Sequence, residues 1–498
     1  MEAASKDKEY PWLARVARPK RPVLALRTPA HRISRRNRSS RATDCKPGVW
    51  ARLRGPLLDS RTPAVAGSSL RGIEGQPWRG THPLPRLRAA LALPRMQPYT
   101  ANHDADAPVQ AADSARPTVA VLRHSFLPYS ETFIHDQLRS HRRYRPVVLA
   151  RRILHPDRFG GHTVTAIENT RAAGQLASLV YGLTGRSRAF DSALRHHHAR
   201  LIHAHFANNG AYAVGFAERH GLPLVVSLHG HDVSVLRSFE RYHPESWFYM
   251  ARLRRLFAHT TLFLAASEEL ATLIVEAGAP AQRVIVHRLG IDVEALGRLP
   301  RPPQGDDGRS LMMVGRFVEK KGHEFGLRAA GALRARGYRF SLDLVGEGPL
   351  KPQYVELIQE LGLTDVVTFH GSLSHAEVLT KMAQAQVLMA PSVVARSGDR
   401  ESGVMVVKEA GGLGLPVVGT RHGGIPEIID DERTGLLVPE RDAPALTSAV
   451  ARLLDDGALR SRLGEAARHK MRTEYSLNAS VQRLEELYDL ALSRYEGR

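Results

Sequence analysis

Two glutamates in the carboxyl-terminal half of the chain stand at a short, defined spacing after an apolar run. Glu401 and Glu409 are separated by seven residues, and an apolar run over 387–392 precedes them. A strand followed by a helix leaves free backbone N–H groups at the helix N-terminus, and these groups favour a phosphate. If the helix begins near Val404, Glu409 lies about 7 Å further along its axis, where its carboxylate can accept hydrogen bonds from ribose hydroxyls. Glu401 then lies on the other side of the phosphate, near a sugar.

The first turn of this helix would face the diphosphate. Gly403 has no side chain where the ligand must approach, and the backbone N–H groups of Val404 and Met405 are free at the helix start. A lone glutamate on a helix is usually a solvated surface residue. The assignment therefore depends on the whole arrangement of strand, glycine and helix.

Two basic residues follow an earlier strand of the same half. Arg316 follows the apolar run 311–314 after Gly315, and Lys321 precedes a second helical stretch. A guanidinium and an ammonium at this position suit a diphosphate, whose charge must be neutralised as it departs. For this motif taken alone, a solvated basic loop is the competing interpretation.

Length and charge show how the chain is organised. At 498 residues it is too long for one ordinary core, so two or more domains are expected. The formal net charge is +20, but residues 1–95 hold 21 Lys and Arg against 6 Asp and Glu, which leaves only +5 for the rest of the chain. The strong basic character is therefore a property of the amino-terminal tail and is weak evidence for nucleic-acid binding.

The tail, residues 1–116, is rich in Arg, Pro and Ser without sustained periodicity, and we predict that it is disordered. Three interpretations are open: a basic arm for nucleic acid or an anionic surface, an organellar transit segment, or translated upstream sequence with Met96 as the true start. We favour the last, because the folded pattern begins only near Pro117. The one cysteine, Cys45, lies in the tail, which excludes a disulfide framework and fits a reducing cytoplasm.

From Pro117 onward, short apolar strands alternate with helical stretches, which predicts mainly parallel sheets covered by helices on both faces. The expected strands of the first set are 118–122, 146–149, 201–206, 223–228, 262–266 and 284–287, and those of the second set are 311–314, 340–345, 366–369, 387–390, 416–418 and 435–438. We therefore expect an α/β protein with two doubly wound, Rossmann-like domains facing a cleft. The predicted divisions are a first domain over 117–298, a Pro-rich linker over 299–308, a second domain over 309–473 and a carboxyl-terminal helix over 474–498.

Histidines cluster after two expected strands of the first domain. His203 and His205 end one strand, and His229 and His231 follow the next. Alternate strand residues share a face, so a metal site is one interpretation. Buried core or helix-capping histidines are the interpretation that we favour, and no metal site is predicted.

The motifs of the second half resemble those of a known family. These motifs are Gly-Arg-x4-Lys-Gly at 315–322, Gly-x-Gly-Pro at 346–349, the two glutamates, Gly-Leu-Pro-Val-Val at 414–418 and Gly-Gly-x-Pro-Glu at 423–427. Through them, residues 311–455 resemble the donor domain of the retaining, GT-B-fold glycosyltransferases of family 4. The resemblance implies that Arg316 and Lys321 bind the donor diphosphate, that Glu409 binds ribose and that Glu401 contacts the transferred sugar. Many members have Phe-Gly where this chain has Gly403-Val404, although the backbone donors remain.

The first half resembles a subset of the same family, the bacterial glycosyltransferases of colanic acid and other exopolysaccharides. The motifs that carry this resemblance are Ser-Glu-Thr-Phe-Ile at 130–134, His-Ala-His-Phe at 203–206 and His-Gly-His-Asp at 229–232. In the wider family, a histidine at the position of His229 faces the transferred sugar. The resemblance thus implies that His229 and Glu401 act at the reacting sugar.

These observations predict a metal-independent, retaining hexosyltransferase without a cofactor. Its partners would be a nucleoside-diphosphate sugar and a saccharide or polyprenyl-linked saccharide acceptor, without specific nucleic-acid binding. We expect it in the cytoplasm. Core packing is the default interpretation of the basic amphipathic stretch 247–257, and peripheral contact with the inner face of the plasma membrane is the alternative. The alternatives are a nucleotide-sugar epimerase or phosphorylase on the same fold, and a non-catalytic protein that binds nucleic acid or anionic surfaces through the tail.

Overall fold

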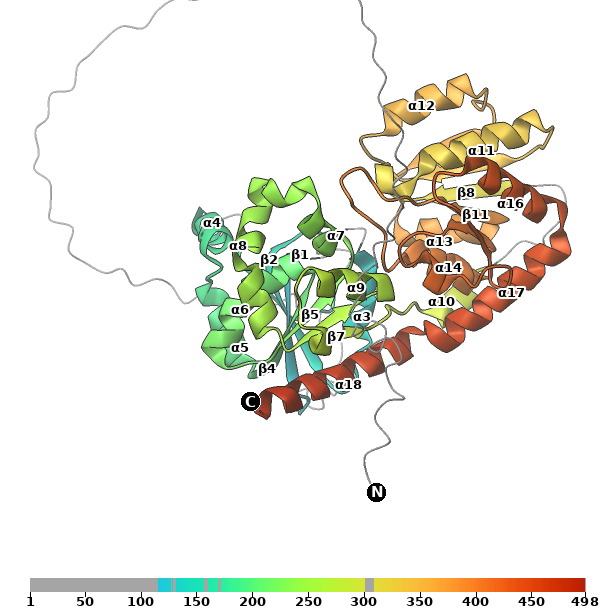
Figure 1. Cartoon of the computed structure of the whole chain (residues 1–498). Helices are drawn as coiled ribbons and strands as arrows, with labels where there is room; N and C mark the ends of the chain where they lie inside the picture. Colours follow the sequence, from blue (N-terminus) through green and yellow to red (C-terminus); the bar gives the residue numbers. More distant parts are fainter. Residues whose placement is uncertain are drawn as a thin grey trace, which may run out of the picture. The chain divides into compact units, whose positions relative to one another are not determined.

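The computed structural model describes residues 115–126, 128, 131–155, 160–168, 172–300 and 309–497. Nearly all of the predicted tail and residues 301–308 of the predicted linker lie outside this range. The described residues form two parallel β-sheets, one after the other along the chain (Figure 1). The predicted fold class of two doubly wound α/β domains is confirmed.

The first sheet has seven parallel strands in the order β3-β2-β1-β4-β5-β6-β7. Its central strands are almost continuous runs of apolar residues, as expected when helices cover both faces of a parallel sheet; β5, for example, is buried along its whole length. The strands are β1 (Thr118–Phe126), β2 (Arg145–Ile153), β3 (Val164–Ala166), β4 (Ala199–His205), β5 (Leu224–Leu228), β6 (Leu262–Ala265) and β7 (Val284–Val286).

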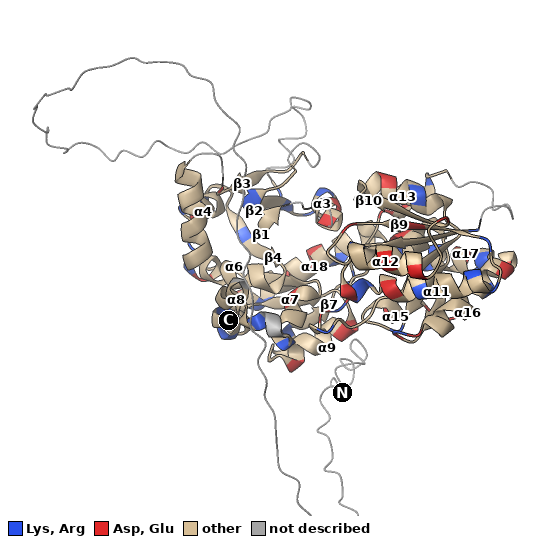
Figure 2. Ribbon diagram, turned by 90° about the horizontal axis from the view of Figure 1, so that it is seen from above, with Lys and Arg blue, Asp and Glu red and all other residues tan. Residues whose placement is uncertain are grey.

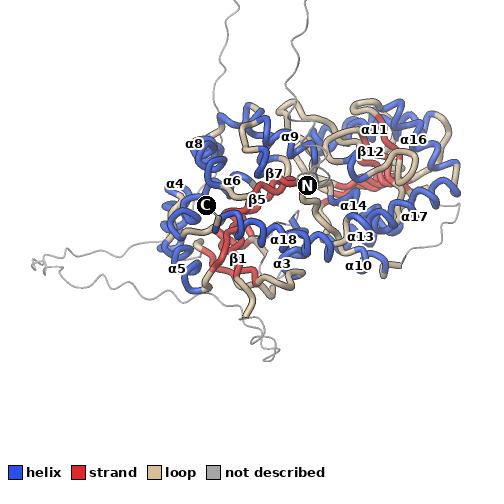
Figure 3. Tube along the Cα trace, turned by 60° about the horizontal axis from the view of Figure 1, so that its bottom comes forward, coloured by secondary structure: helices blue, strands red, loops and turns tan. Residues whose placement is uncertain are grey.

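Helices pack along both sides of this sheet (Figure 3). Several begin at a polar residue whose side chain accepts a backbone N–H bond, as Ser187 does for α5 and Ser267 for α9. The helical segments are α3 (Thr132–Arg139), α4 (Ala172–Thr184), α5 (Arg188–His196), α6 (Ala207–His220), α7 (His231–Ser234), η2 (Val235–Arg237), η3 (Phe239–Tyr242), α8 (Pro244–His259), α9 (Glu268–Glu276), η4 (Ala281–Arg283) and α10 (Val293–Gly297).

The second sheet has six parallel strands in the order β10-β9-β8-β11-β12-β13. They are β8 (Ser310–Val314), β9 (Ser341–Val345), β10 (Val367–Gly371), β11 (Val387–Ala390), β12 (Val417–Thr420) and β13 (Leu436–Val438). The helical segments that follow are η5 (Glu319–Lys321), α11 (His323–Ala335), α12 (Lys351–Glu360), α13 (His375–Gln384), α14 (Met405–Leu413), α15 (Ile425–Ile428), α16 (Ala443–Asp455), α17 (Gly457–Glu474) and α18 (Leu477–Glu496).

Both sheets reverse their strand order at one point. In the first sheet β1 lies between β2 and β4, and in the second sheet β8 lies between β9 and β11. At such a switch point the loops after the two neighbouring strands leave in opposite directions, which opens a crevice beyond the carboxyl ends of the strands. The fold therefore predicts a ligand site beside β1 and β4 and another beside β8 and β11.

Every strand expected from the apolar runs is present. The structure adds β3, which has only three residues, all half-buried, and pairs with one neighbour, β2. A short edge strand of the sequence Val-Thr-Ala has too few apolar residues to stand out from its surroundings.

The last helix packs on the first sheet although it follows the second. Leu484, Leu487 and Tyr488 of α18 are buried in one core cluster with Val119 and Val121 of β1. Glu485 strengthens this packing, because its Oε1 accepts the backbone N–H groups of three successive residues, Arg142 to Tyr144, at 2.8–3.1 Å. The carboxyl-terminal helix is thus part of the core of the first domain.

Candidate functional site

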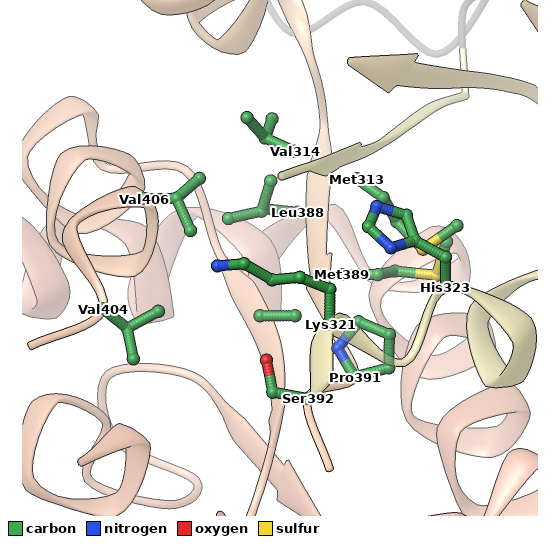
Figure 4. Close-up of a pocket in the computed structure, with 11 residues that line it drawn as sticks. Met313, Val314, Lys321, His323, Leu388, Met389, Pro391, Ser392, Val404 and Val406 are labelled. Carbon is green, nitrogen blue, oxygen red and sulfur yellow. The ribbon is translucent and has the colours of Figure 1, made fainter. Parts of the chain in front are cut away.

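A pocket lies at the switch point of the second sheet, beyond the carboxyl ends of β8 and β11. Figure 4 shows the side chain of Lys321 reaching across it, with the ammonium on the side of Val404 and Val406 at the start of α14. His323 also lines the pocket, and both of its ring nitrogens are buried without a hydrogen-bond partner. The other lining residues are Met313, Val314, Leu388, Met389, Ala390, Pro391 and Ser392.

The glycine before α11 lets the Lys321 segment lie against the β11 loop. Gly322 has a φ of +64°, and a Cβ built on it would lie 1.8 Å from the carbonyl oxygen of Pro391. No other residue fits this close backbone contact without strain. The Lys-Gly part of the Gly-Arg-x4-Lys-Gly motif is therefore explained by local geometry, because this contact holds Lys321 at the pocket.

The helix expected near Val404 begins there. Val404 is the N-cap of α14, and Met405 is its first residue. A Cβ on Gly403 would lie 3.2 Å from Leu289 and 3.4 Å from Ala266. A side chain at position 403 would point at packed protein and not toward a ligand. Close packing therefore explains this glycine, and the prediction that it leaves room for the ligand is wrong.

Glu401 is buried and paired with lysines. Lys321 Nζ donates to its Oε2 at 3.2 Å, and Lys320 Nζ lies 4.0 Å from its Oε1 and 2.9 Å from Asp399 Oδ2. Burial by itself would raise the pKa of Glu401, but Lys321 and Lys320 outweigh it, so the pKa lies below its ordinary value. Burial would also raise the pKa of Asp399, but His231 and Lys320 outweigh it and lower this pKa to about 2. The segment that ends at α14 thus carries ionised carboxylates, each held by an ammonium.

The backbone of Glu401 is fixed by the turn after β12. The N–H of Glu401 donates to His422 Nε2 at 3.0 Å, so the other ring nitrogen, Nδ1, carries the proton and donates to Glu440 at 2.8 Å. A Cβ on Gly423 or Gly424 would lie 2.1 or 2.0 Å from the carbonyl oxygen of Glu401 or Ser402. The Gly-Gly turn is thus explained as the place where the Glu401 loop passes close to another backbone.

Glu409 faces a histidine that the sequence did not indicate. His375 Nε2 lies 2.8 Å from Glu409 Oε1, and the two residues come from the neighbouring helices α13 and α14. This hydrogen bond outweighs burial and raises the pKa of His375 above its ordinary value. The only local signal was the capping box of Ser374 and Glu377, which begins α13 and places His375 at its first position.

Arg316 is exposed after β8, and no residue in the described ranges binds its guanidinium. Its neighbour Phe317 is fully buried and donates its backbone N–H to the carbonyl oxygen of Glu347 at 2.9 Å. The backbone beside Arg316 is therefore fixed, while its side chain is available to a ligand.

In the first domain, His229 follows β5 and pairs with His205 at the end of β4. His229 Nε2 lies 3.1 Å from His205 Nδ1, so one of these nitrogens donates to the other, and His229 Nδ1 is buried without a partner. Burial lowers the pKa of His229 to about 3, with Arg123 adding to the effect, so the imidazole is neutral near pH 7. Asp232 fixes this loop by accepting the N–H groups of His229 and Gly230 at 3.1 and 2.9 Å.

The other histidines of this cluster have structural contacts. His203 binds Tyr488 of α18 at 2.7 Å and Ser227 at 2.8 Å, and His231 pairs with Asp399 at 3.6 Å. Across the described ranges, no group of three or more His, Cys, Asp and Glu residues is placed to hold a metal ion.

The loops that carry His229 and Glu401 meet. A Cβ on Gly230 would lie 3.2 Å from the Cβ of Ser402 and 3.5 Å from the carbonyl oxygen of Arg400. Ser267 at the start of α9 also shares a 3.2 Å hydrogen bond with Ser402. The two residues predicted to act at the reacting sugar therefore lie on adjoining loops.

Comparisons with known proteins agree with this architecture. Residues 136–290 match the model of the Glycosyl transferase 4-like domain, and residues 300–470 match that of Glycosyl transferases group 1. The chain is 31% identical over 295 residues to the putative colanic acid biosynthesis glycosyltransferase WcaL of Salmonella typhimurium, covering 58% of this chain and 70% of the relative.

The chain belongs to the glycosyltransferase family. The WcaL protein of Escherichia coli is 32% identical to this chain over 256 residues. The matched residues make up 51% of this chain and 61% of the length of that relative. The Anabaena protein Alr3699/HepE, solved in complex with UDP-glucose, aligns over 75% of this chain and 99% of its own, with a TM-score of 0.60 at 19% identity. That structural match supports the GT-B fold of this glycosyltransferase.

Proposed function

We propose that this glycosyltransferase moves a hexosyl unit, with retention at the anomeric carbon, from a nucleoside-diphosphate sugar to a saccharide or lipid-linked saccharide acceptor in polysaccharide biosynthesis. The observation that carries the donor assignment is the pocket at the β8–β11 switch point, where Lys321 and the first turn of α14 converge. An ammonium and free helix N–H groups favour the same ligand, an anionic diphosphate.

In this proposal, each donor part has a protein partner. Lys321 and Arg316 bind the diphosphate, together with the backbone N–H groups of Val404 and Met405 at the start of α14. Glu409, oriented by His375, accepts hydrogen bonds from the ribose hydroxyls, and Glu401 contacts the transferred sugar.

Departure of the nucleoside diphosphate drives the reaction. The bond between the anomeric carbon and the phosphate oxygen breaks through an oxocarbenium-like state while Lys321 and Arg316 stabilise the charge that develops on the diphosphate. The acceptor hydroxyl attacks from the face that the leaving group vacates, and its proton passes to a phosphate oxygen. His229, a neutral imidazole with a free Nδ1, is placed to hydrogen-bond a hydroxyl of the sugar.

The exopolysaccharide role is supported by the two WcaL relatives, whose names assign them to colanic acid biosynthesis. The nucleotide-sugar donor is supported by the similar Anabaena protein solved with UDP-glucose. We place the reaction in the cytoplasm, where nucleotide-sugars are made, and we propose that it needs neither a metal ion nor a cofactor, because cationic side chains already face the diphosphate.

A thermal-shift screen of UDP-, GDP-, ADP- and dTDP-sugars tests the donor class, since a ligand that binds only the folded state stabilises it by RT ln(1 + [L]/Kd). We expect one nucleotide series to raise the melting temperature, and the stabilising donor to be consumed by glycosyl transfer in the presence of EDTA. Transfer that EDTA abolishes and Mg²⁺ restores would contradict metal independence. Epimerised donor, or sugar phosphate formed from inorganic phosphate, would instead identify an epimerase or a phosphorylase.

A further inference from the structure

Helix α4 has an apolar face that the fold leaves uncovered. Its sequence, Ala172–Thr184, contains no charged residue, and Figure 2 shows it without Lys, Arg, Asp or Glu. Four aliphatic side chains at helical spacing are exposed, with Leu176 62% and Leu183 71% accessible. The opposite face packs on the domain through Gly174, Ser178 and Tyr181. The remaining exposed members of the apolar face are Leu179 and Val180.

Two exposed aromatic side chains come from η3 and α8. Trp247 and Tyr242 are both exposed, and Trp247 Nε1 donates to the carbonyl oxygen of Tyr242 at 3.0 Å. Helix α8 contacts the end of α4 directly, because Arg252 donates to the carbonyl oxygen of Thr184 at 3.2 Å. We define the α4–α8 face as Leu176, Leu179, Val180, Leu183, Tyr242 and Trp247; it combines aliphatic residues with an indole and a phenol, the aromatic groups enriched at the membrane–water interface.

The rim of this face is positively charged. Four exposed arginines border it, and none of them forms an ion pair with a carboxylate of the described residues: Arg186, Arg188, Arg241 and Arg254. Among the described carboxylates, Glu168, which accepts a hydrogen bond from Ser178 of α4, lies 3.9 Å from Arg151, and Asp191 and Glu218 are paired with other arginines. An apolar face with an arginine rim is complementary to a bilayer with anionic headgroups. A second copy of the chain, or its basic residues 1–95, would oppose like charges at this face.

The α4–α8 face also lies beside the carboxyl edge of the first sheet. Arg151, near the end of β2, donates to Ser178 of α4 at 2.7 Å, and His124, near the end of β1, contacts Tyr181 of α4 with ring centroids 5.4 Å apart. Ligands of such sheets bind beyond this edge. No helix in the described part of the chain has the length and apolar character to cross a membrane, so contact with lipid would occur at a surface such as this one.

We propose that the α4–α8 face binds an anionic lipid bilayer, with α4 lying in the plane of the interface. Bound in this way, the enzyme holds the carboxyl edge of its first sheet at the membrane surface, where a lipid-linked saccharide presents its hydroxyls. The inference of membrane binding depends only on the exposed surface. The inference that membrane binding presents a lipid-linked acceptor rests on the proposed function.

Co-sedimentation of the full chain with vesicles tests this proposal. The probes are vesicles of phosphatidylcholine alone and of phosphatidylcholine with 30% phosphatidylglycerol, at 0.1 and 0.5 M NaCl. High salt screens the attraction of the basic residues 1–95 and leaves apolar insertion. The test variant is Leu176→Gln with Leu183→Gln, and the matched control is Val355→Gln, which changes an exposed aliphatic residue on α12 of the second domain.

We expect the wild type and the control to bind the anionic vesicles at both salt concentrations. The double variant should lose at least tenfold in salt-resistant partitioning, with an unchanged melting temperature and unchanged transfer to a water-soluble acceptor. Salt-resistant binding equal to that of the wild type would overturn the proposal. A concentration-dependent dimer that only the double variant loses would overturn it as well and assign the face to a second copy. If the wild type transferred no sugar to the water-soluble acceptor, that result would count against the proposed function and would not affect the result on lipid binding.

Discussion

The two domains share one topology but differ in the chemistry of their switch points. In the second domain the site is built from charges, because Lys320 and Lys321 hold Glu401 and Asp399 ionised. In the first domain the histidines are neutral rings beside the internally paired Arg123 and Glu131, because burial lowers the pKa of His229 to about 3 and that of His205 well below its ordinary value. A charged site suits the diphosphate of a donor, and a neutral site suits the hydroxyls of a sugar.

The largest expected effect comes from removing a cation of the charged site. Lys321→Ala and Arg316→Ala should each reduce transfer about 100- to 1000-fold, since the loss of one preorganised electrostatic contact to the developing charge costs ~2.7–4 kcal/mol of barrier. Steady-state turnover with the identified donor measures this. Lys351→Ala is the matched control, because Lys351 pairs with Glu347 and lies over the ring of Phe369 on the second domain, away from the pocket lining. Turnover near that of the wild type in both test variants would remove the diphosphate assignment.

Removing His229 from the neutral site should lower transfer less than removing a cation does. The pH profile of transfer should show no fall at acidic pH from this group. His229→Ala should lower transfer about tenfold, as expected for the loss of one hydrogen bond worth ~1–1.5 kcal/mol. Because the pKa of His229 lies near 3, its imidazole stays neutral from pH 5 to 8, and the pH profile of the wild type should show no step from this group.

Two variants complete this test. His205→Asn should give a smaller loss than His229→Ala, since His205 only orients the ring of His229. His469→Ala on the exposed surface of α17 is the control and should turn over like the wild type. A step near pH 6.5 in the wild type that His229→Ala abolishes would show that His229 titrates, and the comparison between the sites would fail.

A buried lysine beside the charged site predicts how stability depends on pH. Lys408 Nζ donates to the carbonyl oxygen of Leu289 at 2.9 Å and lies 5.0 Å from the ring centroid of Tyr475, while Glu409, Glu427 and Arg288 surround it. Burial lowers the pKa of Lys408 to about 7, below its value in an unfolded chain. The unfolded protein therefore binds more protons between pH 7 and about 10, and the free energy of unfolding should rise with pH through the contribution of Lys408.

Lys408→Met removes this contribution while keeping the length of the side chain. Urea unfolding at pH 7, 8 and 9 should show the stability of the wild type improving relative to the variant as the pH rises. Lys351→Met, at an exposed lysine, should show no such trend. If the difference between the wild type and Lys408→Met is independent of pH, Lys408 is not the group that titrates in this range.

The sequence predicts well the parts of the site that are local. The strand before Glu401, the start of α14 at Val404 and the glycine before α11 each depend on a few adjacent residues, and apolar runs and turn glycines reveal them. The roles of Arg316, Lys321 and Glu409, which spacing and charge favoured and the family resemblance implies, remain predictions about binding. The structure adds the local reason for two of the shared motifs, the close approach of Gly322 to Pro391 and of Gly423 to Glu401.

The sequence could not reveal contacts between distant segments. His375 and Glu409 are 34 residues apart, and Lys408 and Leu289 are 119 apart, so no local pattern joins them. Lys408 stands in an apolar stretch of α14, where its burial depends on a carbonyl from another segment. The apolar face of α4 was also missed, because the same spacing of leucines normally predicts a face turned toward the core.

Calorimetric titration with a nucleoside diphosphate alone tests the division of roles most directly. The titrated proteins are the wild type, Glu409→Gln, Glu401→Gln and His229→Ala, and the ligand is the diphosphate whose sugar stabilises the wild type. Only Glu409→Gln should bind it about tenfold more weakly, because the amide replaces one acceptor oxygen with a donor and removes the charge that strengthens the hydrogen bonds to ribose. Glu401→Gln and His229→Ala should bind it as tightly as the wild type and still transfer sugar poorly. Equal weakening in Glu409→Gln and His229→Ala would show that the neutral site binds the nucleotide, which contradicts the assignment of donor diphosphate and sugar to separate sites.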